Sequence, residues 1–233
     1  MHPNVVDEPS FRNRKHVFRD RVQAAELVAE RLRCYGAPET LVLAIPSGGV
    51  PIACTVSGEL GCPMDLIVVR KIPIPWNPEA GLGAVTLDGA MVLNDHVVRE
   101  LNLSEEEIAT LASKVVTIVR ERAKKFGSAE LKAPLKDKTA IITDDGLASG
   151  YTMLAAIGSV RKGQPKQVVV AVPTASTSAL RLVAPLADKV VCLNIRDEPI
   201  YAVADAYQNW RDLSDQEVLT YLKQMKTYVA NAL

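Results

Sequence analysis

The stretch "IITDDGLASGYTM" (141–153) joins the end of an apolar strand, two carboxylates and a glycine-rich loop, and a helical pattern follows it. Glycines allow consecutive backbone N–H groups to turn toward one point, and a helix N-terminus adds partial positive charge there. Ser149 and Thr152 add hydroxyl groups. The loop therefore predicts a phosphate site, although an Asp–Asp pair in isolation is more often only a turn with a helix N-cap.

The two carboxylates, Asp144 and Asp145, come directly before the loop. They would repel the same phosphate, so we expect them to face a neutral or cationic group about one sugar length away. Vicinal ribose hydroxyls and a divalent metal both fit that requirement. The spacing matches neither G-x-x-x-x-G-K-[ST] nor G-x-G-x-x-G, so the pattern favours a sugar phosphate over those nucleotide loops.

Apolar, β-branched runs alternate with helical patterns along the whole chain. The expected strands are 41–45, 64–70, 138–143, 167–173 and 189–195, and the expected helices are 21–35, 50–60, 104–126, 151–162, 175–184 and a closing helix in 214–233. Strands that are apolar on both faces predict a parallel sheet covered on both sides. We predict one α/β domain over 1–233, with a doubly wound, mainly parallel five-stranded sheet.

Two further features complete the expected fold. Asp88-Gly89 lies between two short extended pieces in 83–94, which predicts an added β-hairpin at one edge of the sheet. Asp20 and Ser104 are good N-caps, and Glu107 completes a capping box with Ser104. In such a sheet, ligands bind beyond the carboxyl ends of the strands, which is where Asp144 lies.

Composition limits the class of protein. The 233 residues, 48% of them hydrophobic, are enough for one sizeable core, and 27 basic and 27 acidic side chains give no net charge. Without a basic field we expect no nucleic-acid partner. No secretory signal or run of about 18 apolar residues occurs, so we expect a cytoplasmic protein without a membrane span. Four cysteines without metal-ligand spacing predict reduced thiols.

Residues 140–152 resemble the thirteen-residue signature of the type I phosphoribosyltransferases: four apolar positions, two acids, and a small-residue loop ending in Thr. Those enzymes bind phosphoribosyl pyrophosphate (PRPP). The resemblance implies that Asp144 and Asp145 are catalytic and hold the ribose diol. It also implies that the 5′-phosphate binds to Gly146, Leu147, Ala148, Ser149, Gly150, Tyr151 and Thr152. Ser149 stands where the family commonly has Thr, and Tyr151 replaces a usually small residue.

Two more stretches carry the resemblance. "AIPSGGVPIA" (44–53) is similar to the pyrophosphate loop of the family, and "VVRK" (68–71) is similar to a basic strand end of purine phosphoribosyltransferases. Ser47 stands where the family often has arginine, so one positive contact is missing. The resemblance implies pyrophosphate contacts, with Lys71 also catalytic, from Ser47, Gly48, Gly49, Arg70 and Lys71. A plain strand-to-helix turn and a solvated basic strand end remain the alternatives.

The resemblance covers roughly 15–220 and is strongest to a group of uncharacterised phosphoribosyltransferase-like proteins, which share "RKIPIPWNPEAGLGAV" (70–85) and "WRDLSDQEV" (210–218). It implies a small hood, built by the N-terminal segment and 194–213, that forms the base pocket. The candidate pocket residues are Arg196 and Tyr201, with Asp197 and Glu198 beside them. Alternatively, these charges form a solvated loop and the tyrosines pack into the core. Trp76 is expected in a lid, at a subunit contact, or in an ordinary surface loop.

The implied activity is Mg²⁺-dependent transfer of 5-phosphoribosyl from PRPP to a nitrogenous base, with release of pyrophosphate, as in nucleotide salvage. Substrate and water would hold most of the Mg²⁺ coordination, and Asp144 and Asp145 are its possible protein ligands. A homodimer is expected because type I members usually pair. A non-catalytic PRPP-binding regulatory protein and a hydrolase of a ribosyl phosphate are the alternatives.

Overall fold

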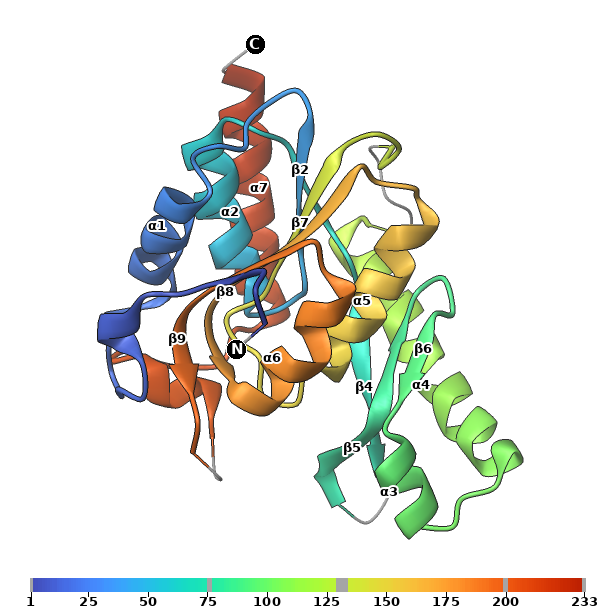
Figure 1. Cartoon of the computed structure of the whole chain (residues 1–233). Helices are drawn as coiled ribbons and strands as arrows, with labels where there is room; N and C mark the ends of the chain where they lie inside the picture. Colours follow the sequence, from blue (N-terminus) through green and yellow to red (C-terminus); the bar gives the residue numbers. More distant parts are fainter. Residues whose placement is uncertain (1, 75–76, 129–133, 199–200, 232–233) are drawn as a thin grey trace.

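The main sheet confirms the predicted α/β class. The computed structural model describes residues 2–74, 77–128, 134–198 and 201–231 (Figure 1). Six parallel strands lie in the order β1 (Val5–Val6), β9 (Lys189–Arg196), β8 (Gln167–Ser176), β7 (Thr139–Thr143), β2 (Thr40–Ala44) and β3 (Met64–Leu66). The β7 strand lies near the centre, so the carboxylates that follow it lie at the middle of the carboxyl edge.

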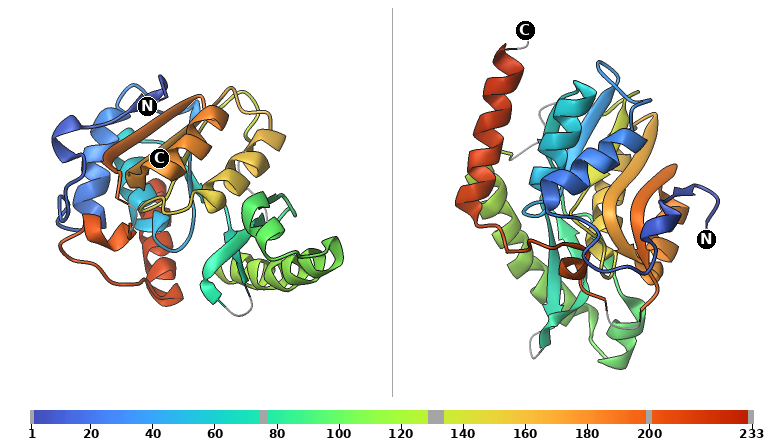
Figure 2. Two further views of the ribbon diagram at one scale, coloured as in Figure 1. Left: turned by 60° about the horizontal axis from the view of Figure 1, so that its bottom comes forward. Right: turned by 90° about the vertical axis from the view of Figure 1, so that its left-hand side faces the viewer.

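Helices cover both faces of this sheet (Figures 1 and 2). The α1 (Arg21–Arg31) and α2 (Gly49–Leu60) helices lie on one face, with α7 (Asp215–Asn231) against α2; α5 (Tyr151–Lys162) and α6 (Thr177–Val183) lie on the other. Side chains alternate along a strand, so neighbours in β7 enter different cores. Ile141 packs with the α1 and α2 side, and Ile142 with the α5 and α6 side. Burial on both faces explains the continuous apolar runs in the sequence.

The prediction of five strands was wrong by one. The additional strand, β1, has only two residues and pairs in parallel with β9 through Val5 and Val190. A pair of valines in a polar N-terminal segment carries no periodic signal, because a two-residue strand is shorter than the window in which alternation can be detected. Its pairing depends on the edge that β9 presents.

The expected strand 64–70 was also wrong, because it divides into two strands of different sheets. After β3 the chain leaves the main sheet, and β4 (Val69–Ile74) joins a small antiparallel sheet with β5 (Asn77–Thr86) and β6 (Met91–Leu93). The predicted hairpin is confirmed as β5–β6, with Gly89 at a φ of 79° in its turn. The hairpin therefore pairs with β4 rather than with an edge of the main sheet.

The small sheet packs against α4 (Glu105–Phe126), and α3 (Asp95–Glu100) lies near it (Figure 1). The predicted capping box of α4 is confirmed: the Ser104 side chain accepts from the Glu107 amide, and Glu107 accepts from the Ser104 amide. An ion pair of 2.7 Å between Lys162 of α5 and Asp88 of the hairpin turn ties the small sheet to the main one. This arrangement brings the C-terminal half of α4 back toward the main sheet.

The two segments predicted to form the hood lie side by side. The Phe18 amide donates to the Ala206 carbonyl at 3.0 Å, and the Asn13 amide donates to the Ile195 carbonyl at 2.9 Å. The short turns η1 (Pro9–Phe11) and η3 (Val203–Ala206) belong to these segments, and the Phe18 and Tyr207 rings pack together in the core. Formation of a base pocket there stays a prediction. Within the described ranges, no helix is long and apolar enough to cross a bilayer.

Candidate functional site

The carboxylate of Asp145 is held by a buried arginine that the sequence interpretation missed. Oδ2 of Asp145 accepts from Nε and Nη2 of Arg21, both at 2.8 Å, and each side chain is about nine-tenths buried. Arg21 is the first residue of α1, where Asp20 caps the helix as predicted. Its guanidinium lies 3.9 Å from the ring centroid of Trp210 and donates to the Arg211 carbonyl at 2.9 Å. Asp145 is therefore largely neutralised and fixed in place.

Asp144 lies in a different electrostatic environment. It retains partial solvent exposure, and its Oδ1 accepts from the Asp145 amide at 2.9 Å. Burial, and then the neighbouring Asp145 carboxylate, raises the pKa of Asp144 well above its ordinary value. Burial also raises the pKa of Asp145, but Arg21 opposes that shift. Among the described residues, no arginine forms an ion pair with Asp144, whereas Arg21 pairs with Asp145. A cation or hydroxyl donor would therefore stabilise Asp144 most.

The loop Ser47–Gly48–Gly49 packs directly against these acids. A Cβ at Gly48 would lie 1.9 Å from Oδ2 of Asp145, and a Cβ at Gly49 would lie 2.6 Å from the Thr143 carbonyl oxygen. Both positions therefore require glycine, because the loop backbone occupies the space beside the carboxylate. The structure brings together the predicted pyrophosphate loop and the predicted diol acids, although about a hundred residues separate them in the sequence.

The backbone donors in this loop differ from those expected. The Gly49 amide donates to the Ile45 carbonyl at 3.0 Å, so it is already engaged within the first turn of α2. Among the described residues, no acceptor is recorded for the amides of Ser47 and Gly48. The peptide bond between Pro46 and Ser47 is cis. The two amides at the start of the loop, rather than that of Gly49, are the donors open to a ligand.

The loop from Gly146 to Thr152 has the geometry expected of an anion site. Leu147 anchors it to β8: its amide donates to the Thr174 carbonyl and its carbonyl accepts from the Ser176 amide, both at 3.0 Å. Gly150 has a φ of 84°, and α5 begins after it. Ser176 Oγ donates to the Ala148 carbonyl at 2.7 Å, while the side chains of Ala148 and Ser149 are exposed.

Apart from the Leu147 amide, the backbone donors of this loop have no recorded acceptor among the described residues. The first hydrogen bond of α5 runs from the Leu154 amide to the Gly150 carbonyl. Within 134–198, no acceptor is recorded for the amides of Ala148 through Met153, as is normal for the first turn of a helix. Gly146 has no room for a side chain, since a Cβ there would lie 2.6 Å from Val203. A row of amides beside an exposed surface can bind a phosphate group.

Arg70 and Lys71, the two basic residues predicted to contact the diphosphate, lie on β4. Arg70 is exposed, and Lys71 is half-buried with its aliphatic stem over Gly81, where a Cβ would lie 2.7 Å from Cδ of the lysine. They belong to the small sheet and not to the strand of the main sheet from which contact with a diphosphate was inferred. Their part in binding stays a prediction. Trp76, in the same stretch, lies outside the described residues.

The predicted base-pocket residues separate into two groups. Arg196 is fully buried; it donates to Glu198 at 2.6 Å and to the Arg14 carbonyl at 3.3 Å, and in the described structure its Nε has no partner. Its guanidinium lies 5.8 Å from the ring centroid of Tyr201, whose hydroxyl donates to Thr174 at 3.0 Å. The solvated-loop alternative is therefore wrong for Arg196. Burial raises the pKa of Tyr201.

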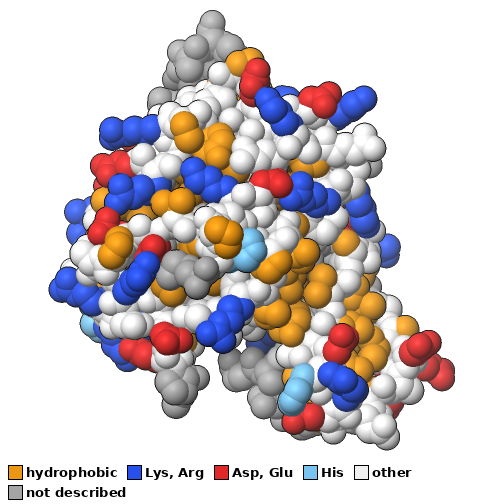
Figure 3. Space-filling view, in the orientation of Figure 1, with side chains coloured by type: hydrophobic (Ala, Val, Ile, Leu, Met, Phe, Trp, Pro, Cys, Tyr) orange, Lys and Arg blue, Asp and Glu red, His pale blue; other side chains and the backbone are white. Residues whose placement is uncertain are grey.

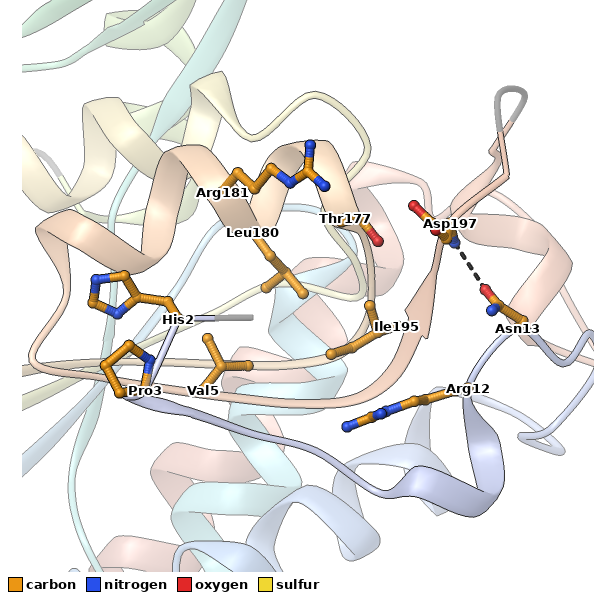
Figure 4. A pocket seen from close by; sticks show the side chains of 10 residues that line it. All are labelled: His2, Pro3, Val5, Arg12, Asn13, Thr177, Leu180, Arg181, Ile195 and Asp197. Atoms are coloured by element: carbon orange, nitrogen blue, oxygen red, sulfur yellow. Dashed lines mark hydrogen bonds between the residues drawn. The ribbon is translucent and has the colours of Figure 1, made fainter.

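Asp197 lies elsewhere, at a cavity of about 550 Å³ between the N-terminal segment, α6 and the end of β9 (Figure 4). Side chains alternate along a strand, so Ile195 faces this cavity while Arg196 faces away from it. The Asp197 amide donates to Asn13 at 2.8 Å. None of the residues predicted to bind PRPP lines this cavity. Asp197 is therefore separated from the Arg196 and Tyr201 pair.

A second arginine missed in the sequence reaches the predicted pyrophosphate loop. Arg122 of α4 donates through Nη2 to Ser47 Oγ at 2.5 Å and to Asp215 at 3.2 Å. Arg122 does not belong to a purely solvated face of α4, because its guanidinium packs on Phe126 and contacts Ser47 and Asp215. The shared segment 210–218 was the available signal, because its Trp210 stacks on Arg21 and its Asp215 pairs with Arg122.

The comparisons with known proteins agree with this geometry. The family described as "Phosphoribosyl transferase domain" matches residues 86–207, just over half of the chain. Proteins of two Mycobacterium tuberculosis strains, CDC 1551 / Oshkosh and ATCC 25618 / H37Rv, are each 36% identical over 216 residues, or 93% of this chain. Their names assign them provisionally as phosphoribosyl transferases. The chain spans about half of their length, 48%.

A solved structure is also similar. The protein TT1426 from Thermus thermophilus is 35% identical, with a TM-score of 0.73, and the match covers 89% of this chain and 98% of that one. The likeness therefore extends over most of both chains. Together with the family match and the expected signature at 140–152, it shows that the chain belongs to the phosphoribosyl transferase family.

Proposed function

We propose that the chain transfers 5-phosphoribosyl from PRPP to a nitrogenous base and releases pyrophosphate, in an Mg²⁺-dependent reaction of cytoplasmic nucleotide salvage. The observation that carries this proposal is the contact of Gly48 with the Asp145 carboxylate, where an added Cβ would lie 1.9 Å from Oδ2. The contact places a loop with open amides beside two acids, and a second row of open amides follows those acids directly. These three elements match, in order, the diphosphate, ribose and 5′-phosphate of PRPP.

The 5′-phosphate would bind to the amides of Ala148 through Thr152, with hydroxyl groups from Ser149 and Thr152. Asp144 is the stronger candidate for the ribose diol, because Arg21 already occupies Oδ2 of Asp145. Two ribose hydroxyls would donate to the Asp144 carboxylate and offset part of the burial that raises its pKa. Asp145 then acts by holding the loop and Arg21 in position.

In the reaction the bond from C1 of the ribose to the diphosphate oxygen breaks, and its electron pair leaves with the pyrophosphate. The lone pair of the base nitrogen forms the new bond to C1, and a proton carried by that nitrogen is released to solvent. Positive charge develops on the ribose and negative charge on the leaving diphosphate. The protein needs no covalent nucleophile, so its contribution is positioning and charge stabilisation. The amides of Ser47 and Gly48, with Arg70 and Lys71, are the groups we propose to contact the diphosphate. Arg196 and Tyr201 remain the proposed contacts to the base.

The acids suit a magnesium ion, since carboxylate oxygens are ligands that Mg²⁺ prefers. Among the described residues, no group of three or more His, Cys, Asp or Glu side chains is placed to hold a metal, so most ligands would come from substrate and water. Asp144 is the preferred protein ligand and Asp145 the second. When bound, the ion supplies positive charge to the diphosphate and ribose oxygens.

The first experiment is thermal unfolding with and without PRPP and Mg²⁺. A ligand that binds only the folded state must raise Tm. We expect a rise in the wild type and its loss in Asp144→Asn. The matched control is Asp137→Asn, because Asp137 is exposed and lies just before the opposite end of β7. No rise in the wild type would reject PRPP as the ligand. If Tm rises, pyrophosphate release measured with purines, pyrimidines and pyridine carboxylates in turn would identify the acceptor.

We also propose a homodimer. Figure 3 shows hydrophobic side chains gathered on the face that carries α5, α6 and the small sheet. Leu182 and Leu186 near α6 and Met91 of β6 are between 42% and 52% exposed. Burial of such side chains against a second copy would be favourable. Sedimentation at micromolar concentration should give a species near twice 25.2 kDa, and a monomer would reject the proposal.

A further inference from the structure

The predicted pyrophosphate loop lacks its own cation. Ser47 occupies the position before the two glycines, and among the described residues the loop from Pro46 to Gly49 carries no charged side chain. A leaving diphosphate bears several negative charges, so a loop that offers only amides would leave much of that charge unbalanced. The structure places one guanidinium at this point, from a helix 75 residues further along the chain.

That guanidinium belongs to Arg122, whose Nη2 donates to Ser47 Oγ at 2.5 Å. The side chain is one-fifth exposed and packs over Phe126, with 5.4 Å from the guanidinium to the ring centroid. Ordering of the side chain by Phe126 and Ser47 lowers the entropic cost of presenting it to a ligand. Arg122 is thus both accessible and held in place.

The charge of Arg122 is only partly neutralised. Its partner Asp215, at the start of α7, lies 3.2 Å from Nη2 of Arg122 and 2.7 Å from Nζ of Lys125. Lys125, and then Arg122, lowers the pKa of Asp215, so this carboxylate is ionised at neutral pH. Two cations share one anion, which leaves the cluster with a net positive charge beside Ser47. Arg122 can therefore exchange a shared carboxylate for a more highly charged ligand.

We propose that Arg122 is a diphosphate-binding residue: it supplies from α4 the positive charge that position 47 lacks, and Asp215 competes with the diphosphate for it. The inference rests on the proposed function and deepens it. A guanidinium can donate two parallel hydrogen bonds to phosphate oxygens, which is a stronger interaction than its single bond to a serine hydroxyl. Binding would move its donors from Ser47 and Asp215 to the diphosphate.

A purely structural role for Arg122 makes a different prediction. If the arginine only ties α4 to α7, removal of either Arg122 or Asp215 breaks the same tie and affects ligand binding in the same direction. If Asp215 competes with the ligand, the two variants act in opposite directions. The sign of the Asp215 effect therefore separates the two roles.

The experiment is isothermal titration of the full chain with inorganic pyrophosphate in Mg²⁺ and, separately, with ribose 5-phosphate. Arg122→Gln should weaken pyrophosphate binding at least about tenfold, since the paired hydrogen bonds to a charged group and the positive charge of the guanidinium are lost. Ribose 5-phosphate, which has no diphosphate, should bind Arg122→Gln as it binds the wild type. Asp215→Asn should tighten pyrophosphate binding. Arg120→Gln is the matched control, because Arg120 is exposed on the same helix, and it should bind both ligands unchanged.

Three results overturn the inference: unchanged pyrophosphate affinity in Arg122→Gln, an equal loss in Arg120→Gln, or weaker binding in Asp215→Asn. If Arg122→Gln does not fold, Arg122→Lys keeps the charge and loses the paired donors, and it must still weaken pyrophosphate binding. The two proposals fail in distinguishable ways. A wild type that binds neither ligand rejects the proposed function, whereas binding of both with no effect at Arg122 rejects this inference alone.

Discussion

Substitution of Gly48 by alanine tests whether the predicted pyrophosphate loop packs on Asp144 and Asp145. The new Cβ would lie 1.9 Å from Oδ2 and 2.2 Å from Cγ of Asp145. Asp145 cannot move away easily, because Arg21 holds Oδ2 from two nitrogens at 2.8 Å and the Tyr207 hydroxyl donates to the Asp145 carbonyl at 2.6 Å. Either the loop shifts or the buried ion pair opens.

The cheaper of these two responses sets the size of the effect. Overpacking typically costs about 1–3 kcal/mol, whereas breaking a buried ion pair costs about 3–5 kcal/mol, so the loop should shift. For a chain of this length each kcal/mol lowers Tm by about 2–4 °C, which gives a fall of about 2–12 °C. The control is Gly58→Ala in the same helix, α2, where a Cβ would meet nothing within 4 Å. That change should stabilise the protein by about 0.5–1 kcal/mol.

The assay is urea unfolding of the single variants Gly48→Ala, Gly58→Ala and Asp145→Ala, and of the double variant that combines Gly48→Ala with Asp145→Ala. Removal of the carboxylate removes the clash, so the cost of Gly48→Ala should shrink in the Asp145→Ala background, and the two changes should be non-additive. A Gly48→Ala protein as stable as Gly58→Ala, or strict additivity in the double variant, would show that Gly48 does not pack on the Asp145 carboxylate.

The other predictions concern each part of the site. The pKa of Asp144 is raised in the folded state, so its contribution to stability is fully present below the unfolded pKa and is lost as pH rises through the folded value. In urea unfolding, the free energy of unfolding of Asp144→Asn should therefore increase relative to that of the wild type from about pH 4 toward neutrality. A difference that stays constant with pH would contradict this. Gly150 has a φ of 84°, and a Cβ there would lie 3.3 Å from Ala179, so Gly150→Ala should lower the free energy of unfolding by about 1 kcal/mol in the same assay. An unchanged free energy of unfolding would argue against the left-handed turn before α5. Lys71→Ala should reduce turnover about a hundredfold, or about 2–3 kcal/mol, and weaken PRPP binding less, in steady-state and binding measurements. Full turnover in that variant would place Lys71 outside the site, whereas binding without turnover on any base would favour the regulatory alternative.

Features that the chain encodes locally could be predicted from the sequence. The Ser104 capping box, the Asp88-Gly89 hairpin and the helix after Gly150 each depend on residues a few positions apart. The loop at 141–153 was found for the same reason, because its acids, glycines and helix start are contiguous. Periodicity also predicted the parallel sheet, since strands buried on both faces must be apolar at every position.

The meeting of distant polar side chains depends on the tertiary packing. Arg21 and Asp145 are 124 residues apart, and Arg122 and Ser47 are 75 apart, so no local pattern distinguished these arginines from solvated ones. The same holds for the burial of Arg196 and for the division of 64–70 between two sheets, which depend on the segments that pack beside them. Side-chain periodicity indicates whether a face of a helix or strand is buried, but it does not indicate which segment covers that face. A polar residue at a helix end has the same local sequence whether it meets water or a carboxylate, and only the packing of the two helices against the sheet determines which.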